Sequence, residues 1–356
     1  MDRRTVEVYE QRAADWVVHR KRPEPESLTE FVRRVPAGEP RLDLGCGPGW
    51  HTAALGTPAI ALDAAKAMLD LVATNAPAAG CVQGDLEALP FRRGALGGTW
   101  AHKCYMHVPA ERVPLALADL HRAMSVGAAL HVQVTSDRKR ENIDDRFPGR
   151  HFSWWPVDRF ADVITGAGFD ALSVVDDGEE WIDVEATRAR TLPDTVGPNM
   201  RLLLVGLNPS EYSADAGSGF ARPGNRFWPA ALAAGLVTRT HDPFHAIRVD
   251  GIGMTDLVKR ATPRADVLTR EEFLLGAARL ERLVRWLEPR AVCFVGLTGY
   301  RVAVDRKAQS GWQSQPFGGR PAYVMPNTSG VNGHVKPAEL AEHLHAAASS
   351  GPPSRT

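Results

Sequence analysis

Short apolar runs alternate with amphipathic segments through the first half of the chain. The apolar runs predict strands over 41–44, 59–62, 80–83, 98–102 and 128–134. The segments with a helical spacing of apolar residues predict helices over 64–74, 113–124 and 157–167, and residues 1–35 are also helical and amphipathic. Strands that alternate with helices indicate a parallel sheet covered on both faces.

The periodicity stops over 191–198, where two prolines and a glycine fall in eight residues, and we predict a linker there. A second alternating series then begins with an apolar strand over 200–206, and includes a helix over 273–287 and strands over 291–295 and 321–325. We therefore expect one domain over 1–190, a second over 199–347, and a disordered tail over 348–356 that is rich in Ser, Gly and Pro.

Length and composition agree with two soluble domains, since the chain has 356 residues, of which 44% are hydrophobic and 24% charged. No apolar run approaches the ~18 residues of a membrane span, and the first residues lack a signal-peptide core, so we expect a cytoplasmic protein. The four cysteines are scattered, so neither a metal site nor an iron–sulfur cluster is predicted.

Charge is unevenly distributed although the net charge is zero. From residue 199 onward there are 19 Lys and Arg against 13 Asp and Glu, a balance of +6, and the preceding residues carry −6. A basic C-terminal half suits a polyanionic partner such as DNA.

The first strand runs into Asp-Leu-Gly-Cys-Gly-Pro-Gly at 43–49, a turn whose glycines let the backbone approach a nucleotide. Asp63 ends the next strand, 20 residues after Asp43, where a carboxylate can accept hydrogen bonds from both ribose hydroxyls. Asp85 ends a third strand, at the place where an adenine amino group would lie.

With these residues, the segment 5–190 resembles the class I S-adenosylmethionine-dependent methyltransferases. The resemblance implies a doubly wound, Rossmann-like sheet and S-adenosylmethionine as the cofactor. It also implies that the cofactor is bound by Asp43, Gly45, Cys46, Gly47, Asp63, Asp85 and Leu86. The helix between Asp43 and Asp63 is about one turn shorter than the family leads us to expect.

The methyl acceptor cannot be identified from the sequence, because methyl transfer depends on positioning and needs no fixed catalytic dyad. The resemblance places five residues near the acceptor pocket: His102, Tyr105, His107, Trp154 and Trp155. Direct methylation of DNA bases is disfavoured, since the region after the fourth strand lacks an Asn/Asp-Pro-Pro-aromatic motif and no Pro-Cys nucleophile is present.

A second motif, Gly-Leu-Asn-Pro-Ser at 206–210, follows the first strand of the C-terminal half. Pro209 prevents the strand from continuing and so places Asn208 at the carboxyl edge of the sheet, where ligand crevices form. A neutral amide is no strong base, but it can hold a water molecule. Such a site suits cleavage of an N-glycosidic bond, in which the base departs as an anion and water captures the sugar cation.

The segment 199–347 resembles the mismatch-specific uracil-DNA glycosylases and their thymine-DNA glycosylase relatives. The motif at 206–210 and Gly-Phe-Ala-Arg-Pro-Gly-Asn-Arg-Phe-Trp at 219–228 carry this resemblance. It implies that Asn208 and Thr255 hold the attacking water. It also implies that the flipped base is bound by Ser213, Phe220 and Ala221, and the DNA by Asn225, Arg226, Ser329, Gly330, Val331 and Asn332. Val331 stands where the family usually has a larger residue, which fills the gap that the flipped nucleotide leaves in the DNA.

The sequence therefore predicts a two-domain α/β enzyme that joins a methyltransferase to a smaller three-layer α/β/α glycosylase. We expect hydrolytic excision of uracil, or a related damaged pyrimidine, from uracil-containing or mismatched DNA, together with methyl transfer to an unknown acceptor. Three alternatives stay open. One is a small-molecule or RNA methyltransferase with an inactive glycosylase half, another is a DNA-binding module that targets a methyltransferase, and the third is a pair of enzymes that make and remove one modified base.

Overall fold

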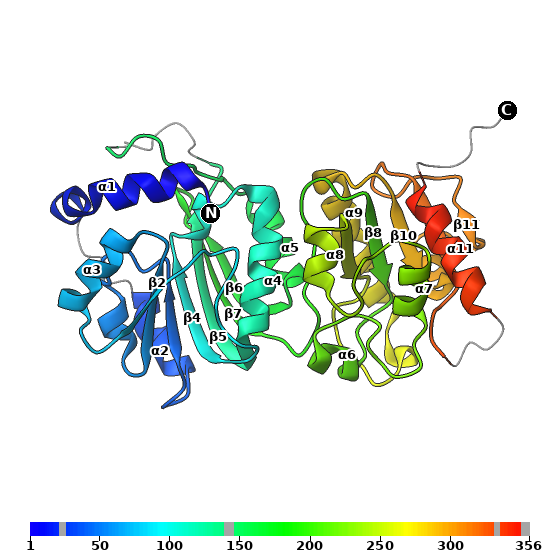
Figure 1. Cartoon of the computed structure of the whole chain (residues 1–356), viewed down its shortest axis with the longest axis horizontal. Coiled ribbons are helices and arrows are strands. Elements are labelled where there is room, and N and C mark those ends of the chain that lie inside the picture. Colours follow the sequence, from blue (N-terminus) through cyan, green and yellow to red (C-terminus); the bar gives the residue numbers. More distant parts are fainter. Residues whose placement is uncertain (21–25, 139–145, 331–334, 350–356) are drawn as a thin grey trace. The chain divides into compact units, whose positions relative to one another are not determined.

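A computed structural model describes residues 1–20, 26–138, 146–330 and 335–349. The chain divides into two compact units (Figure 1). The first comprises Met1–Thr165 and Phe169–Ala189, and the second comprises Gly166–Gly168 and Arg190–Thr356. Each unit has its own sheet.

The first unit is built on a seven-stranded sheet with the order β3-β2-β1-β4-β5-β7-β6. Strands β1 to β5 are parallel, and β7 is antiparallel to both β5 and β6. The strands are β1 Arg41–Leu44, β2 Ala59–Asp63, β3 Gly80–Gln83, β4 Leu96–His102, β5 Met124–Thr135, β6 Phe169–Asp176 and β7 Trp181–Arg188. The helices are α1 Arg3–His19, α2 Glu26–Arg34, α3 Lys66–Asn75, α4 Val113–Ala123 and α5 Val157–Gly166.

The order of this sheet determines where a ligand can bind. From β1 the chain moves to β2 and β3 on one side, and then returns to β4 on the other side of β1. A crevice forms where the strand order reverses, at the carboxyl ends of β1 and β4. The shortened helix that the sequence predicts after the glycine turn is a single 3-10 turn, η1 Thr52–Leu55.

The second unit has a five-stranded sheet with the order β11-β12-β10-β8-β9, in which only β11 is antiparallel. The strands are β8 Leu202–Gly206, β9 Ile252–Asp256, β10 Val292–Val295, β11 Gly311–Trp312 and β12 Ala322–Met325. The helices are α6 Glu211–Ala216, α7 Phe227–Ala233, α8 Pro243–Arg248, α9 Arg270–Leu287, α10 Leu297–Ala303 and α11 Pro337–Ala348. The order reverses between β8 and β10, so the end of β8 is the expected ligand site.

Helices cover both faces of the second sheet (Figure 1). Alternate residues of β8 point to opposite faces, and Leu202 and Leu204 pack with α7 and α11 in one core cluster. The α/β class predicted for both units is confirmed. Within the described ranges, none of the helices has the length and hydrophobicity that a membrane crossing requires.

The segment 191–198, which the sequence predicts as a linker, is part of the second unit. Thr195 forms an antiparallel bridge with Met254 of β9, and Asp194 and Val196 are buried. Prolines and glycine mark turns, but the apolar side chains between them anchor the segment to the sheet. At the other end of the unit, α11 extends to Ala348, and residues 350–356 of the predicted tail lie outside the described residues.

Candidate functional sites

The glycine turn of the first unit is attached to the end of β2. The amides of Gly45 and Cys46 both donate to the carbonyl of Leu62, at 2.8 and 3.0 Å, and the amide of Gly47 donates to Oδ2 of Asp63 at 2.9 Å. Gly45 has a φ of 67°, and a Cβ there would lie 2.4 Å from the Cβ of Cys104. The close approach and the left-handed backbone both require glycine.

Two buried carboxylates, Asp43 and Asp63, lie at this turn. Burial raises the pKa of Asp43 to about 7, and the nearby charge of Asp63 also raises it. The hydrogen bond that Asp43 accepts from the Thr52 hydroxyl at 2.6 Å lowers the pKa, but its effect is smaller than that of burial. Burial also raises the pKa of Asp63, although the amides of Ala65 and Gly47 donate to it. A cationic ligand would stabilise the ionised form of both groups.

A cavity of about 670 Å³ opens beside these carboxylates, within the size range of small-molecule sites. Six of the seven predicted cofactor residues line it: Asp43, Gly45, Cys46, Gly47, Asp63 and Leu86. Asp85 does not line the cavity. Its carboxylate accepts hydrogen bonds from the amino group of Met1 at 2.7 and 2.9 Å.

The residues predicted near the acceptor divide into two groups. His102, His107 and Trp154 line the same cavity, whereas Tyr105 and Trp155 are fully buried in the core. Burial lowers the pKa of His102 to about 2, so this side chain is neutral and weakly basic.

His107 is held by hydrogen bonds at both ring nitrogens. Nδ1 lies 2.7 Å from the carbonyl of His151 and therefore donates, which leaves Nε2 to accept from the Tyr9 hydroxyl at 2.9 Å. Tyr9 could not be predicted as part of this site, because it lies on α1, far in sequence from the glycine turn.

In the second unit, Asn208 follows β8 and its amide group is held by the protein. Nδ2 donates to the carbonyls of Pro209 and Arg260 and to Oγ1 of Thr262, at 3.1, 3.0 and 2.8 Å. The Thr262 hydroxyl donates to the carbonyl of Arg264, so its oxygen accepts from Asn208. Across the described part of the chain, no group donates to Oδ1 of Asn208, which can therefore accept a hydrogen bond from a water molecule.

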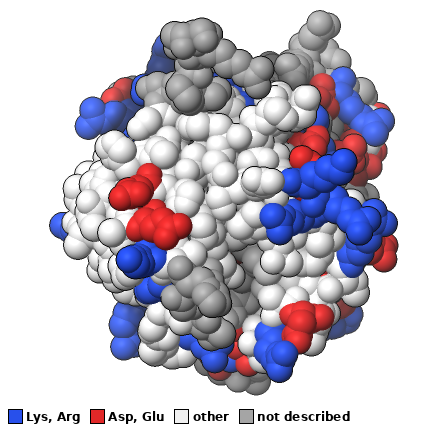
Figure 2. All heavy atoms as spheres, turned by 90° about the vertical axis from the view of Figure 1, so that its right-hand side faces the viewer, with Lys and Arg blue, Asp and Glu red and all other residues white. Residues whose placement is uncertain are grey.

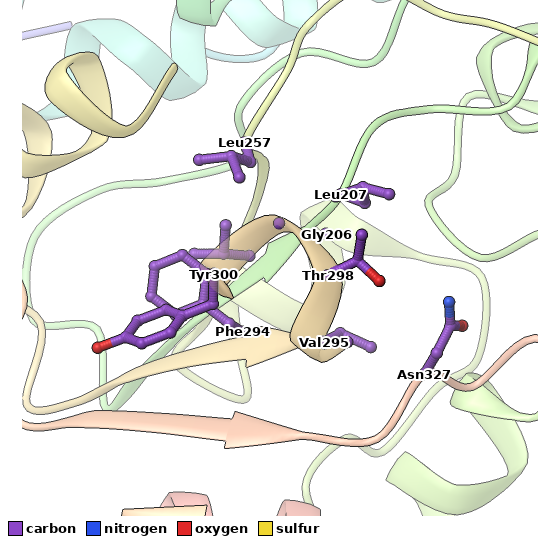
Figure 3. A pocket seen from close by; sticks show the side chains of 11 residues that line it. Gly206, Leu207, Leu257, Phe294, Val295, Thr298, Tyr300 and Asn327 are labelled. Atoms are coloured by element: carbon purple, nitrogen blue, oxygen red, sulfur yellow. The ribbon is translucent and has the colours of Figure 1, made fainter. Parts of the chain in front are cut away.

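Two small hollows flank the end of β8. Figure 3 shows the one on the β10 side, of about 20 Å³, where Gly206 and Leu207 lie near Thr298 of α10 and Asn327, which follows β12. Asn327 lies two residues before Ser329, the first of the predicted DNA-binding residues in this segment, and was not itself predicted to take part in the site.

The hollow on the β9 side has a volume of about 30 Å³ and is lined by Phe220, Thr255 and Asp256 among others. The Phe220 ring stacks on Phe227, with 4.1 Å between centroids, and its backbone has a φ of 58°. A left-handed conformation is costly for a bulky residue and is typical of functional sites.

Asp256 is a site residue that the sequence analysis missed. It ends β9 beside Gly206, and a Cβ on Gly206 would lie 2.3 Å from Oδ1 of Asp256 and 3.7 Å from the Phe220 ring. Burial raises the pKa of Asp256 to about 6, against the opposing effect of Lys259. A prediction that β9 pairs with β8 would have placed Asp256 at a strand end next to Asn208 and so indicated it as a site residue.

Two further predicted pocket residues have protein partners. Thr255 is buried, and its hydroxyl donates to Oδ1 of Asp194 at 2.6 Å rather than joining the contacts of Asn208. Ser213 is buried in α6, and its Oγ lies 3.1 Å from the Oγ of Ser210, the N-cap of that helix. Ala221, directly after Phe220, is half-buried.

Two of the residues predicted to bind DNA, Arg226 and Ser329, are joined to each other in the described part of the chain. The Arg226 guanidinium donates to the carbonyls of Ser329 and Val335, which ties the 219–228 loop to the segment after β12. Oδ1 of Asn225 accepts from the amide of Phe227 at 2.9 Å. A Cβ on Gly330 would lie 2.6 Å from the carbonyl of Gly224. Val331 and Asn332 lie outside the described residues.

Figure 2 shows one face of the second unit, on which basic and acidic side chains are interspersed and uncharged residues cover most of the surface. Among the residues that the structure describes, no group of three or more His, Cys, Asp and Glu side chains is placed to hold a metal ion.

Comparison with known proteins gives two family matches. Residues 42–132 match a methyltransferase domain, and residues 193–347 match the uracil DNA glycosylase superfamily. The chain is also similar to solved structures. It is 19% identical to the chain in the DhpI–SAH complex, with a TM-score of 0.42, and the match covers 52% of this chain and 96% of that one. It is 14% identical to geranyl diphosphate C-methyltransferase from Streptomyces coelicolor (TM-score 0.40, covering 46% of this chain and 76% of that one) and 17% identical to an S-adenosylmethionine dependent methyltransferase from Mesorhizobium loti (TM-score 0.39, covering 46% of this chain and 96% of that one).

Proposed function

We propose that this chain, which joins a methyltransferase domain to a domain of the uracil DNA glycosylase superfamily, removes uracil from DNA by hydrolysis with its second unit and transfers methyl groups with its first. The observation that supports uracil removal is the orientation of the Asn208 side chain. Three acceptors hold its NH₂ group, so the carbonyl oxygen is left to bind water at the sheet edge where the strand order reverses.

In the proposed reaction the N-glycosidic bond breaks, and its electron pair leaves with uracil. Water then attacks C1′ of the sugar, whose positive charge resembles that of other glycosidic transition states. Oδ1 of Asn208 accepts one hydrogen bond from this water and so directs a lone pair toward C1′. The Asp256 carboxylate, on the neighbouring strand, takes the proton that the water loses.

Binding of a base requires the walls of the site to move. The hollow beside Phe220 has about 30 Å³, which is roughly the volume of one water molecule. We propose that a flipped uracil enters beside Phe220 and displaces Pro243 and Phe244, which begin α8 and line the same hollow.

Incubation of excess protein with a duplex that contains one uracil, followed by alkaline cleavage at the abasic site, tests the proposal. Wild-type protein should release uracil, and Asn208→Ala should slow release by about 100-fold or more, the range for loss of a group that acts on the attacking water. Gln313→Ala is the matched control. Its amide also donates to two carbonyls, but it follows β11 at the opposite edge of the sheet, and release should not change.

If wild-type protein releases no uracil, glycosylase activity on this base is excluded. Binding of the duplex without release would then favour the alternative of a DNA-binding module attached to a methyltransferase. The same assay with mismatched and damaged pyrimidines defines the range of bases.

The cofactor of the methyltransferase domain is S-adenosylmethionine. Its sulfonium and ammonium groups fit a cavity whose turn carries the buried carboxylates Asp43 and Asp63, and its methyl carbon is the group transferred. We propose that Asp63 binds the ribose, and that the turn over Gly45 and Gly47 holds the amino-acid part. Titration calorimetry tests this proposal, because Asp63→Ala should abolish the heat of S-adenosylmethionine binding, whereas Asp70→Ala, on the exposed side of α3, should leave it unchanged.

A further inference from the structure

The cavity of the first unit extends beyond the predicted cofactor residues. Its remaining walls are aromatic and basic. The aromatic side chains include Tyr9, Trp16, Phe152, Trp154 and Trp181, and the cations among the described residues are Arg20, Lys103, Arg146 and Arg150. Glu180 is the one carboxylate that the described part of the chain contributes to this region. Of the three carboxylates that the described residues contribute to the lining, two belong to the predicted cofactor residues, whereas all four Lys and Arg side chains belong to the remaining residues.

Lys103 follows β4 directly, at the reversal point of the sheet, and its backbone is held in place. Its φ is 61°, a left-handed conformation that is strained for a lysine. The amide of Lys103 donates to the carbonyl of Gln133 on β5 at 3.1 Å, so the sheet imposes this conformation. The constraint directs the side chain to the cavity, which it lines.

The ammonium group of Lys103 lies over the Trp181 ring, 3.7 Å from its centroid. Arg20 lies over the Trp16 ring at 4.9 Å. Neither cation forms an ion pair with a carboxylate of the described residues. Burial lowers the pKa of Lys103, and the charge of Arg20 lowers it further, although Asp183 and Glu180 act in the opposite direction. Two like charges that influence each other in a partly desolvated site are stabilised by a bound anion.

Arg150 lies among several aromatic rings near this end of the cavity. Its guanidinium is buried and lies within 6 Å of four ring centroids, the nearest being Phe152 at 4.9 Å, and it donates to the Tyr9 hydroxyl at 3.0 Å. Rings fixed in this way form flat, apolar walls against which a planar ligand can stack.

We propose that this end of the cavity binds the methyl acceptor, that the acceptor is a small aromatic molecule with an acidic group, and that Lys103 and Arg20 bind the acidic group. The proposal rests on the proposed methyl transfer and adds the chemical class of its substrate. Cationic acceptors are disfavoured because four basic side chains surround the site. Lys103 and Arg20 are positioning residues, since they hold the acceptor and the aromatic walls orient it toward the cofactor.

Calorimetric titration of the full chain, saturated with S-adenosylhomocysteine, tests this inference with three probes of similar size. They are 4-hydroxybenzoate, its neutral methyl ester and the cation tyramine. We expect 4-hydroxybenzoate to bind about 10-fold more tightly than either of the others, the effect of one charge-assisted hydrogen bond. Equal binding of the ester, tighter binding of tyramine, or no binding of 4-hydroxybenzoate would overturn the proposal.

Variants identify the groups responsible. Lys103→Met and Arg20→Met should each remove most of the preference for the acid, whereas Lys103→Arg, which keeps the charge, should retain it. Lys66→Met removes an exposed lysine of α3 that does not line the cavity, and should have no effect. Binding of S-adenosylhomocysteine to each variant shows that the cofactor end is intact. A wild-type protein that binds neither cofactor nor acid would instead contradict the proposed methyl transfer itself.

Discussion

Asp194 and Arg279 form a buried ion pair in the second unit, in which Nη1 of Arg279 donates to Oδ2 of Asp194 over 2.6 Å. Asp194 belongs to the segment before β8, and Arg279 to the middle of α9. The other carboxylate oxygen accepts from Lys259 at 2.8 Å and from the Thr255 hydroxyl. One carboxylate thus joins the entry segment, the end of β9 and the longest helix of the unit.

We predict that Asp194→Ala destabilises the second unit by about 3–5 kcal/mol, because it leaves the Arg279 charge buried without its partner. Hydrogen-exchange mass spectrometry should show faster exchange in β9 and α9. The matched control is Asp215→Ala, which removes the exposed partner of Arg190 and should cost at most about 1 kcal/mol.

The same ion pair predicts a pH dependence. Burial alone would raise the pKa of Asp194, but Arg279 and Lys259 outweigh it and hold the pKa below its usual value. An acid whose pKa is lowered by folding contributes stability above its unfolded pKa, near 4, and this stability is lost as the pH falls through the folded value. Unfolding by urea should therefore become easier in acid in the wild type, and Asp194→Asn should lose part of this dependence.

A second pH effect should appear in cofactor binding. The pKa of Asp43 is raised to about 7, so the carboxyl is partly protonated near neutrality, and a cationic ligand would drive its ionisation. We expect the affinity for S-adenosylmethionine to rise between about pH 6 and pH 8, with release of a proton. Calorimetry in two buffers of different ionisation enthalpy measures that proton, and Asp43→Asn should abolish its release.

Uracil excision should depend on the ionisation of Asp256, whose pKa is raised to about 6. If the carboxylate takes a proton from the attacking water, the single-turnover rate should rise with pH and level off above that value. Asp256→Asn should reduce the rate by about 10²–10⁴-fold and remove the acid limb of the profile. An unchanged profile in this variant would assign Asp256 a structural role.

The packing of α9 behind the site gives a prediction of stability. A Cβ on Gly276 would lie 1.9 Å from the carbonyl oxygen of Leu257, directly after β9. Gly276→Ala should therefore force α9 away from the sheet and cost about 1–3 kcal/mol or more, despite the higher helix propensity of alanine. Leu275→Ala, at an exposed position of the same helix, should change the free energy of unfolding little, and thermal unfolding compares the two.

Local sequence was sufficient to predict most strands and helices. The runs at 41–44 and 80–83 have the bounds of β1 and β3, because apolar residues flanked by turn-forming residues leave little choice of conformation. The sequence did not predict strand β9, although Thr255 in it is one of the residues that the family resemblance implies for the site. Its partner β8 lies about 50 residues away in sequence, so its pairing is decided by the sheet and not by a local pattern.

The sequence by itself determined the two families of domain, the glycine turn at Asp43 and the position of Asn208 at a strand end, because each depends on residues close together in the chain. Only the tertiary structure decided which way the Asn208 amide faces, that Asp256 lies beside Phe220, and that Lys103 meets Trp181 in a cavity with Arg20. These relationships join separate elements, and the pKa of a buried group depends on every charge around it. Folding brings those charges together, and no local pattern records them.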